Sequence, residues 1–241
     1  MTMHFTADWD TYQIARKNRK IPVTSRGGAA VLSDIAINKK KDNVYIENID
    51  SIIALALKYS FVISLGTTFR PAGIIDACDE AHIMETCKQK EICHYIQKQG
   101  VGVIVENVGH IDINKIHTHS KLLREINAPI MPLGPIPIDS AVGNDHIAAA
   151  IGAAFMGYYG CAHIINAISP TEHLTSIFTY EDMKRALSAA KIAAQSVNIN
   201  NFVKCQNIEH DIYVKRAIKK TCLIGDEKNC TRCDILCPLK M

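Results

Sequence analysis

The sequence has almost no net charge of either sign: 27 lysine and arginine residues face 24 aspartate and glutamate residues, which leaves +3. Nucleic-acid-binding domains are usually far more basic, so we expect no nucleic-acid partner. The first residues also lack a basic stretch followed by a long apolar one, so we expect no secretory signal and a cytoplasmic protein. The residues that are present, 48% apolar and 21% charged, have the composition of a globular protein and exclude a disordered chain.

Charged side chains are absent from residues 146–171, a segment long enough to span a bilayer. Several glycines, His163 and Asn166 interrupt it, and Pro170 ends it. These interruptions favour a buried helix over residues 147–155 and a strand over residues 162–168. We therefore expect no membrane association.

Short apolar runs alternate along the chain with longer segments of helical pattern. The predicted buried strands cover residues 61–65, 101–105 and 129–133. The predicted helices cover residues 49–60, 80–99, 113–126, 179–196 and 208–221. This alternation predicts the α/β class, with a parallel sheet or barrel whose active site lies at the C-terminal ends of the strands.

The composition changes near Asn198, where an alanine-rich helical segment gives way to polar sequence. We place a domain boundary there, between a barrel-type domain at residues 1–197 and a small helical segment at residues 198–241. The basic runs at residues 16–20 and 39–41 are interpreted as solvated surface.

Nine cysteines without an export signal indicate metal ligands or catalytic thiols. Cys230, Cys233 and Cys237 form a C-x2-C-x3-C pattern near the end of the sequence. Three thiolates this close can hold a [4Fe–4S] cluster with one open iron, which can chelate S-adenosylmethionine. They can equally hold zinc, with a fourth ligand from Cys205, His210 or Cys222. The spacing alone leaves both interpretations open.

Two histidines follow predicted elements, at positions where a barrel would point them into one mouth. His110 ends the polar stretch at residues 106–110, and His146 follows Asn144 and Asp145. Together they could bind a divalent metal and leave positions open for substrate. Two ordinary histidines with satisfied hydrogen bonds are the alternative. The histidines in predicted helices, which we assign no function, include His94, His117 and His119.

A phosphate site is indicated at residues 25–30, where Ser25, Arg26 and two glycines precede a helix-compatible stretch. Glycine allows close approach of the backbone, a helix N-terminus offers free N–H groups, and arginine adds a charged fork. A simple turn is the alternative, because Gly-Gly before a helix is common in turns.

Taken together, these motifs resemble one family, the phosphomethylpyrimidine synthases of thiamine biosynthesis, over almost the whole chain. The matching stretches, besides the terminal cysteines, are residues 25–28, 64–71, 76–81, 106–110, 133–135, 143–147, 150–154, 157–160 and 170–174. The resemblance implies a (β/α)8 barrel, here only its C-terminal portion, followed by an iron–sulfur segment. It also implies a radical S-adenosylmethionine carbon–carbon lyase, which converts 5-aminoimidazole ribotide to 4-amino-5-hydroxymethyl-2-methylpyrimidine phosphate. A related branch converts the same ribotide to 5-hydroxybenzimidazole.

The resemblance further implies roles for individual residues. Cys230, Cys233 and Cys237 would hold the [4Fe–4S] cluster that binds S-adenosylmethionine. His110 and His146 would bind a divalent metal, zinc or iron. The ribotide would be held by His4, Ser25, Arg26, Gly27, Arg70 and Glu106, and Glu106 would also act in catalysis.

The sequence departs from the family pattern in the pocket, in the cysteine spacing and in length. Thr67 stands where the family has aspartate, Met131 stands where it has tyrosine, and the last cysteine spacer is one residue short. Family members are much longer, and this sequence begins about where the middle of the barrel would be. We therefore expect a partner chain, or a second copy, to supply the missing half. A benzimidazole-type enzyme and a non-catalytic paralogue or subunit are the alternatives.

Overall fold

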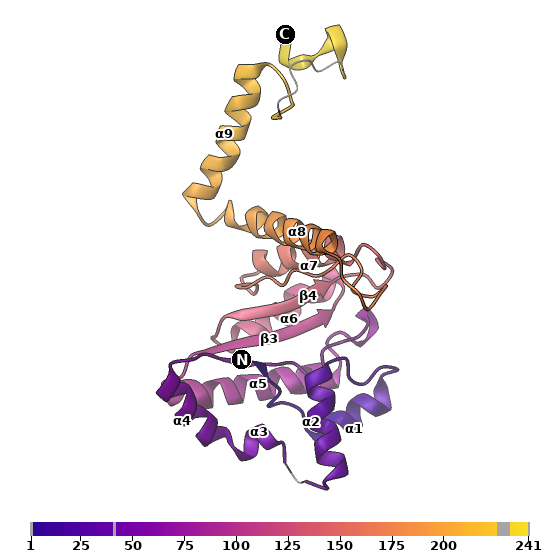
Figure 1. The fold of residues 1–241 in the computed structure, drawn as a ribbon, viewed down its shortest axis with the longest axis vertical. Helices are drawn as coiled ribbons and strands as arrows, with labels where there is room; N and C mark the ends of the chain where they lie inside the picture. The colour runs from indigo at the N-terminus through magenta and orange to yellow at the C-terminus, as the bar shows by residue number, and fades with distance from the viewer. Residues whose placement is uncertain (1, 41, 226–231, 241) are drawn as a thin grey trace. The chain divides into compact units, whose positions relative to one another are not determined.

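The computed structural model describes residues 2–40, 42–225 and 232–240 (Figure 1). The chain forms two compact units, Met1–Ala194 and Gln195–Met241, where the sequence predicted a boundary between residues 197 and 198. The first unit contains the sheet. The described part of the second unit contains α9 (Val203–Lys219) and the short 3-10 helices η2 (Asp234–Leu236) and η3 (Pro238–Lys240).

Four parallel strands form one sheet in the described residues, in the order β1-β2-β3-β4. Ser64 pairs with Thr2 on one side and with Ile104 on the other, and Glu106 pairs with Met131. The α/β class is therefore confirmed, and the sheet is consistent with part of a barrel. The strand bounds are β1 (Thr2–Met3), β2 (Ile63–Leu65), β3 (Val103–His110) and β4 (Ile130–Ile136).

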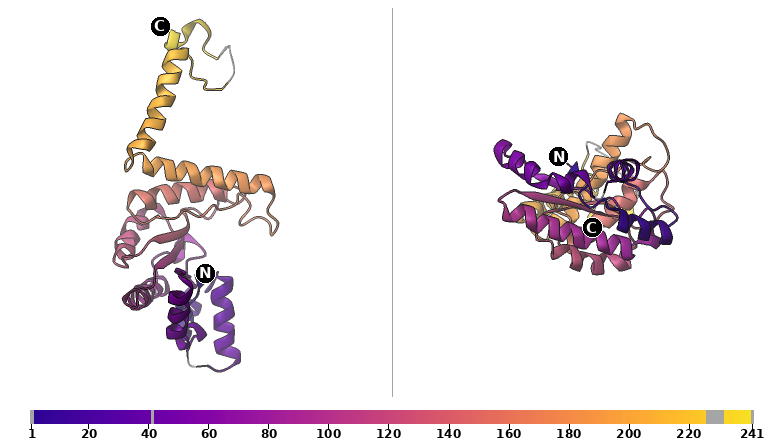
Figure 2. Two further views of the ribbon diagram at one scale, coloured as in Figure 1. Left: turned by 60° about the vertical axis from the view of Figure 1, so that its left-hand side comes forward. Right: turned by 90° about the horizontal axis from the view of Figure 1, so that it is seen from below.

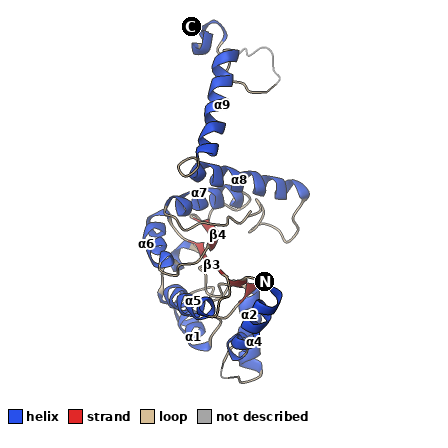
Figure 3. Cartoon of the chain, turned by 90° about the vertical axis from the view of Figure 1, so that its left-hand side faces the viewer, coloured by secondary structure: helices blue, strands red, loops and turns tan. Residues whose placement is uncertain are grey.

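Helices connect these strands, and α5 and α6 lie on the same side of β3 (Figure 3). Side-chain caps explain where these two helices begin. Asp79 accepts a hydrogen bond from the backbone N–H of His82 in α5, and Asp112 accepts one from Lys115 in α6. The helix bounds are α1 (Trp9–Asn18), α2 (Arg26–Ile37), α3 (Val44–Glu47), α4 (Ile49–Tyr59), η1 (Ile74–Asp76), α5 (Glu80–Lys98), α6 (Ile113–Arg124), α7 (Asp145–Tyr158) and α8 (Tyr180–Asn198).

The main core lies between the strands and their covering helices, and it contains Leu65, Val105, Ile96 and Leu123, all fully buried. Strands buried on both faces require continuous apolar runs, which is why the sequence located β2, β3 and β4. A second cluster joins α1 to α2 through small and branched side chains such as Ala15 and Leu32. Figure 2 shows the ribbon of these N-terminal helices, coloured indigo, in two further views.

The strand predicted over residues 162–168 is wrong, because this segment is irregular. It still runs beside β4: the backbone N–H groups of His163 and Ile164 donate to Ile130 O, and Asn166 Nδ2 donates to Pro132 O at 3.0 Å. Proline has no N–H to donate, so β4 cannot offer a continuous ladder at this edge. Side chains therefore replace part of the backbone pairing.

The solvated interpretation of the basic run at residues 16–20 is wrong for Arg19, whose side chain is fully buried. Its guanidinium donates to both carboxylate oxygens of Asp79 and to Phe69 O. The pair connects the end of α1 to the start of α5, and the planar guanidinium suits a two-point contact with a carboxylate.

The uncharged segment at residues 146–171 contains all of α7 except its first residue, Asp145, and the helix has 14 residues. Among the described helices, none combines the length and the apolar character needed to cross a membrane.

Candidate functional site

The end of β1 and the start of α2 meet around the ring of His4. Ser25 caps α2, and its Oγ lies 3.2 Å from His4 Nε2, while Thr68 Oγ1 lies 3.2 Å from His4 Nδ1. A Cβ on Gly27 would lie 2.5 Å from the His4 ring, so this close approach requires glycine. Burial, and then the charge of Arg70, lowers the pKa of His4 to about 4, which leaves the ring neutral near pH 7.

Glu106 lies on the face of β3 that points away from α5 and α6. Its Oε1 accepts hydrogen bonds from Ser64 Oγ (3.3 Å) on the neighbouring strand β2 and from Thr2 Oγ1 (2.8 Å) on β1, the next strand along the sheet. Burial lowers the pKa of Arg70, and the negative charge of Glu106 opposes that effect most strongly. A half-buried cation and a buried carboxylate therefore lie close enough to interact on this face of the sheet.

The loop that carries Arg70 is held by Glu85, a fully buried carboxylate on α5. Glu85 accepts hydrogen bonds from the Thr67 hydroxyl (2.6 Å) and from the backbone N–H groups of Thr68 (2.5 Å) and Phe69 (2.8 Å). Arg70 Nη1 in turn donates to Thr67 O at 3.1 Å. Burial raises the pKa of Glu85, and these hydrogen bonds oppose the increase. Thr67 is fully buried and supports the loop through Glu85.

A β-bulge near the end of β3 directs His110 into the site. Val108 has a φ of 73° and Gly109 a φ of 112°, and the register with β4 shifts between Val108 and His110. A positive φ is unfavourable for a β-branched residue, so this bend is held by its surroundings. The backbone N–H of His110 donates to Pro71 O (3.1 Å), which joins the strand end to the Arg70 loop.

Two histidines, each bonded to a carboxylate, lie beside one another at this point. His110 Nδ1 is 2.7 Å from Asp139 Oδ1, and His173 Nδ1 is 2.8 Å from Asp145 Oδ1. The ring centroids are 5.0 Å apart in an edge-to-face arrangement. Burial lowers the pKa of His110 and the Asp139 carboxylate opposes this. A carboxylate on Nδ1 fixes the ring so that Nε2 can accept a metal or a proton.

A cavity of about 420 Å³ lies beside Arg70 and the His110–His173 pair. Its lining includes Arg70, Gly109, His110, Glu172 and His173. It is large enough for a small phosphorylated metabolite, and it offers a cation, a carboxylate and imidazoles in one concave surface.

The remaining predicted residues lie as follows. Arg26 is exposed at the first position of α2. His146 is near the start of α7, where burial, and then Arg185, lowers its pKa. His146 lines a pocket together with residues of α8, including Arg185. The predicted pairing of His146 with His110 stays a prediction.

Of the three clustered cysteines, Cys233 is exposed and Cys237 is half-buried, both as free thiols. Cys230 lies outside the described residues. The cluster assigned to this trio stays a prediction.

The sequence interpretation overlooked Glu85, Asp139 and His173 as parts of the site. His173 lies in the matching stretch at residues 170–174, which was a usable signal. Glu85 belongs to a polar stripe on α5 whose other buried members are His82, Thr86 and Gln89. Buried polar side chains at helical spacing indicate a hydrogen-bonded interior network, and this stripe could have been found.

A parallel α/β sheet that gathers an arginine, a glutamate and carboxylate-bound histidines near the ends of its strands has the arrangement typical of active sites in α/β enzymes. More specifically, the chain belongs to the Radical SAM ThiC family, whose family model matches residues 1–241. The resemblance seen in the sequence motifs is thereby confirmed.

Curated relatives agree with this assignment. The chain is 34% identical over 264 residues to the phosphomethylpyrimidine synthase of Carboxydothermus hydrogenoformans, covering 100% of this chain and 61% of that protein. It is 38% identical over 202 residues to the phosphomethylpyrimidine synthase of Methanocaldococcus jannaschii, and 37% identical over 202 residues to that of Archaeoglobus fulgidus. Each of these two matches covers 83% of this chain and 47% of the relative. The chain therefore spans about half to three-fifths of the length of these relatives.

Proposed function

We propose that this chain contributes the ribotide site and a metal site to a radical S-adenosylmethionine lyase of thiamine biosynthesis. The proposed substrate is 5-aminoimidazole ribotide, and the proposed product is 4-amino-5-hydroxymethyl-2-methylpyrimidine phosphate. The observation that carries the proposal is the meeting of Arg70, Glu106 and the His110–His173 pair at one end of a parallel sheet.

The phosphate of the ribotide would be bound by positive charge and backbone N–H groups. Arg70 is the half-buried cation that lines the cavity, and the N-terminus of α2 would add the Ser25–Gly27 backbone and the exposed Arg26. Glu106 already accepts two hydroxyl hydrogen bonds, so it is suited to accept further ones from the ribose or the aminoimidazole.

The proposed divalent metal, zinc or iron, would be held by His110 and His146, as the family resemblance implies. The Asp139 carboxylate on His110 Nδ1 supports this role, because such a bond orients a metal-binding imidazole. We add His173 to the set, since its ring lies beside His110 and is oriented in the same way by Asp145.

The iron–sulfur cluster would be held by Cys230, Cys233 and Cys237. Cys233 and Cys237 are free thiols, which is the state that ligation requires. When bound, the cluster would supply the electron for cleavage of S-adenosylmethionine, while the chain's own residues bind and orient the ribotide and exclude water.

We also propose that activity requires a second copy or a partner chain that completes the barrel. In the described residues β1 is a two-residue edge strand with a neighbour only on its β2 side. An open sheet edge next to a binding site is a natural position for further strands. A non-catalytic subunit is the second candidate function, and it is favoured by the same sheet edge.

Anaerobic iron reconstitution of the chain, alone and with a candidate partner, tests the proposal. We expect S-adenosylmethionine and 5-aminoimidazole ribotide to release 5′-deoxyadenosine and a pyrimidine phosphate, identified by mass spectrometry. Release of 5-hydroxybenzimidazole would instead assign the chain to the related branch. Iron uptake without cleavage, with every partner, would support the non-catalytic subunit.

Matched variants separate binding from chemistry. Cys233→Ala should abolish 5′-deoxyadenosine release and leave ribotide binding unchanged, as measured by titration calorimetry. Arg70→Ala should abolish ribotide binding, whereas Arg124→Ala on the exposed part of α6 should not. Equal binding by Arg70→Ala and wild type would overturn the assignment of the phosphate site.

A further inference from the structure

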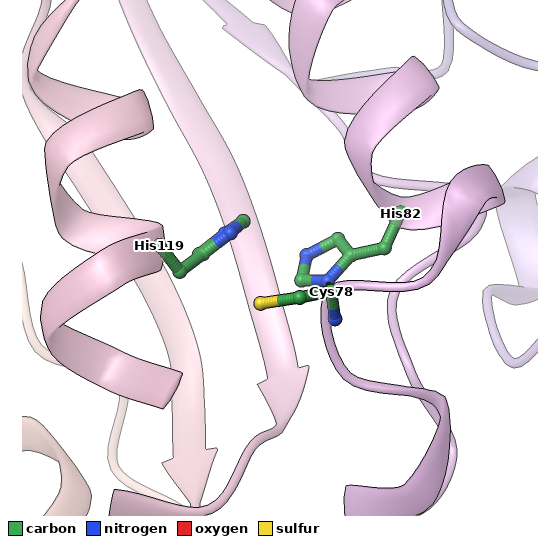
Figure 4. Close-up of side chains that lie close together, drawn as sticks. All are labelled: Cys78, His82 and His119. Atoms are coloured by element: carbon green, nitrogen blue, oxygen red, sulfur yellow. Dashed lines mark hydrogen bonds between the residues drawn. The ribbon is translucent and has the colours of Figure 1, made fainter. Parts of the chain in front are cut away.

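Three side chains with metal-ligating atoms meet on the opposite face of β3, in the layer between the sheet and its helices. They are Cys78 in the turn before α5, His82 in the first turn of α5, and His119 on α6. One ligand atom of each lies within 4.8 Å of the others. Figure 4 shows the Cys78 sulfur pointing into the space between the two imidazoles.

Asn107 of β3 fixes the proton position on both rings. Its Oδ1 accepts from the backbone N–H of Val108 (2.6 Å), which identifies this atom as the amide oxygen. The same oxygen lies 2.7 Å from His119 Nε2 and 3.3 Å from His82 Nε2. An amide oxygen can only accept, so both rings carry their proton on Nε2 and keep a lone pair on Nδ1.

These lone pairs are available to a ligand. His119 is only 2% exposed, so water does not reach its ring freely. Among the described residues, its buried Nδ1 atom has no hydrogen-bond partner. His82 Nδ1 accepts one hydrogen bond, from the backbone N–H of Cys78 at 3.2 Å. Burial lowers the pKa of His82 to about 4 and lowers the pKa of His119 well below its usual value, so both rings are neutral.

From this geometry we propose that Cys78 Sγ, His119 Nδ1 and His82 Nδ1 form a binding site for a thiophilic divalent cation of the zinc class. One thiolate and two neutral imidazoles are a donor set that zinc prefers, and three protein ligands leave a fourth position for water or a small ligand. Asn107 would hold both imidazoles from behind, as carboxylates and carbonyls do in other zinc sites. Binding replaces the thiol proton with the metal and exchanges one hydrogen bond of His82 for a coordinate bond.

The site is separate from the proposed ribotide site. Asn107 and Glu106 are consecutive in β3, so their side chains lie on opposite faces of the sheet. The cation would tie the turn at Cys78 to α6 through the core layer, and it does not depend on the proposed lyase function.

Cobalt is the probe, because a Co²⁺–thiolate bond gives a charge-transfer band in the near ultraviolet. The test uses the full chain with Cys230→Ser, Cys233→Ser and Cys237→Ser, which removes the competing terminal thiols. We expect one equivalent of Co²⁺ to bind with a thiolate band and to be displaced by Zn²⁺. Zinc should also raise the temperature of unfolding, since it binds only the folded site.

Single substitutions in that background assign the ligands. Cys78→Ser should remove the thiolate band, and His119→Asn should lower Co²⁺ affinity at least about tenfold. Cys87→Ser on the same helix as His82, and His117→Asn on the same helix as His119, are exposed controls that should change neither. Absence of the band before any further substitution would overturn the proposal, and so would its persistence in Cys78→Ser.

Discussion

Glu85 offers the most direct test of how the site is built, because its carboxylate holds the loop that presents Arg70. Its two oxygens share four donors: Oε1 accepts from the Thr6 hydroxyl and the Thr68 N–H, and Oε2 from the Thr67 hydroxyl and the Phe69 N–H. In Glu85→Gln one oxygen becomes an NH2 group. The hydroxyl on that side can rotate and accept from it, but a backbone N–H cannot.

One buried N–H is therefore left without an acceptor in either orientation of the glutamine. Such a group costs about 1–3 kcal/mol of stability. Burial raises the pKa of the Glu85 carboxyl, so a neutral side chain recovers part of this cost, and we expect the lower half of that range. For a chain of this size each kcal/mol lowers the unfolding temperature by roughly 2–4 °C.

The effect on ribotide binding should be of similar size to the effect on stability. If the loop must reorganise on binding at a cost of about 1.4 kcal/mol, the affinity for the ribotide falls about tenfold. Urea unfolding and titration calorimetry measure the two quantities, with Glu91→Gln on the exposed face of α5 as the matched control. The reasoning is refuted if Glu85→Gln changes stability by less than about 0.5 kcal/mol, the usual range for surface substitutions, and leaves ribotide affinity unchanged.

Three further predictions concern other parts of the first unit. Gly27→Ala places a Cβ 2.5 Å from the His4 ring, so it should displace that ring and weaken ribotide binding at least several-fold in calorimetry. Burial lowers the pKa of His82 from 6.5 to about 4, so as the pH falls the unfolded chain takes up this proton before the folded chain does. The contribution of His82 to the free energy of unfolding should therefore be complete above pH 6.5 and decrease by up to about 3 kcal/mol as the pH drops to 4, as measured by urea unfolding. Asp139→Asn removes the carboxylate that orients His110 and should weaken binding of a divalent ion there by about 10–100-fold in competition with a chromophoric chelator.

Each of these predictions has a matched control. Gly225→Ala adds a Cβ with nothing within 4 Å and should bind the ribotide like wild type. His82→Gln should reduce the slope of stability against pH, whereas the exposed His117→Gln should leave the slope unchanged. Equal slopes in the two variants would show that folding does not lower the pKa of His82. An exposed carboxylate, Glu181→Gln on α8, should leave metal affinity unchanged, and a similar loss in both carboxylate variants would remove the special role of Asp139.

The sequence predicted those elements whose signals are local. Asp79 and Asp112 mark helix starts by capping, and the apolar runs mark the strands. The end of β3 was missed, because the apolar run stops at Val105 while the strand continues to His110. Pairing with β4 extends the strand through polar residues, and such pairing is a tertiary property that a single segment does not encode.

The site was predictable in its residue types and only partly in its partners. Arg70 and Glu106 were found from motifs. The structure places them close enough for the negative charge of Glu106 to raise the pKa of Arg70. The contact between His110 and His173 joins residues 63 positions apart and depends on the bulge at Val108. Neither periodicity nor spacing specifies such a contact, because the bulge changes the direction of one side chain without changing the apolar pattern.

Strand β3 gives the two faces of the sheet different chemistry through the alternation of its side chains. Glu106 faces the proposed ribotide site, while Asn107 accepts from three groups and donates to Thr86 and Gln89 on the helical side. A substitution at Asn107 would therefore disturb the imidazoles of the proposed zinc-class site directly, and the ribotide site only through the backbone. Because Gln89 also donates to Glu106 O at 2.6 Å, the strand is fixed from the helix side at the residue that the substrate would meet. Loss of metal affinity with retained ribotide binding is thus the expected result of Asn107→Ala, which removes the oxygen that orients both imidazoles, and coupled loss of both would mean that the two faces act as one site.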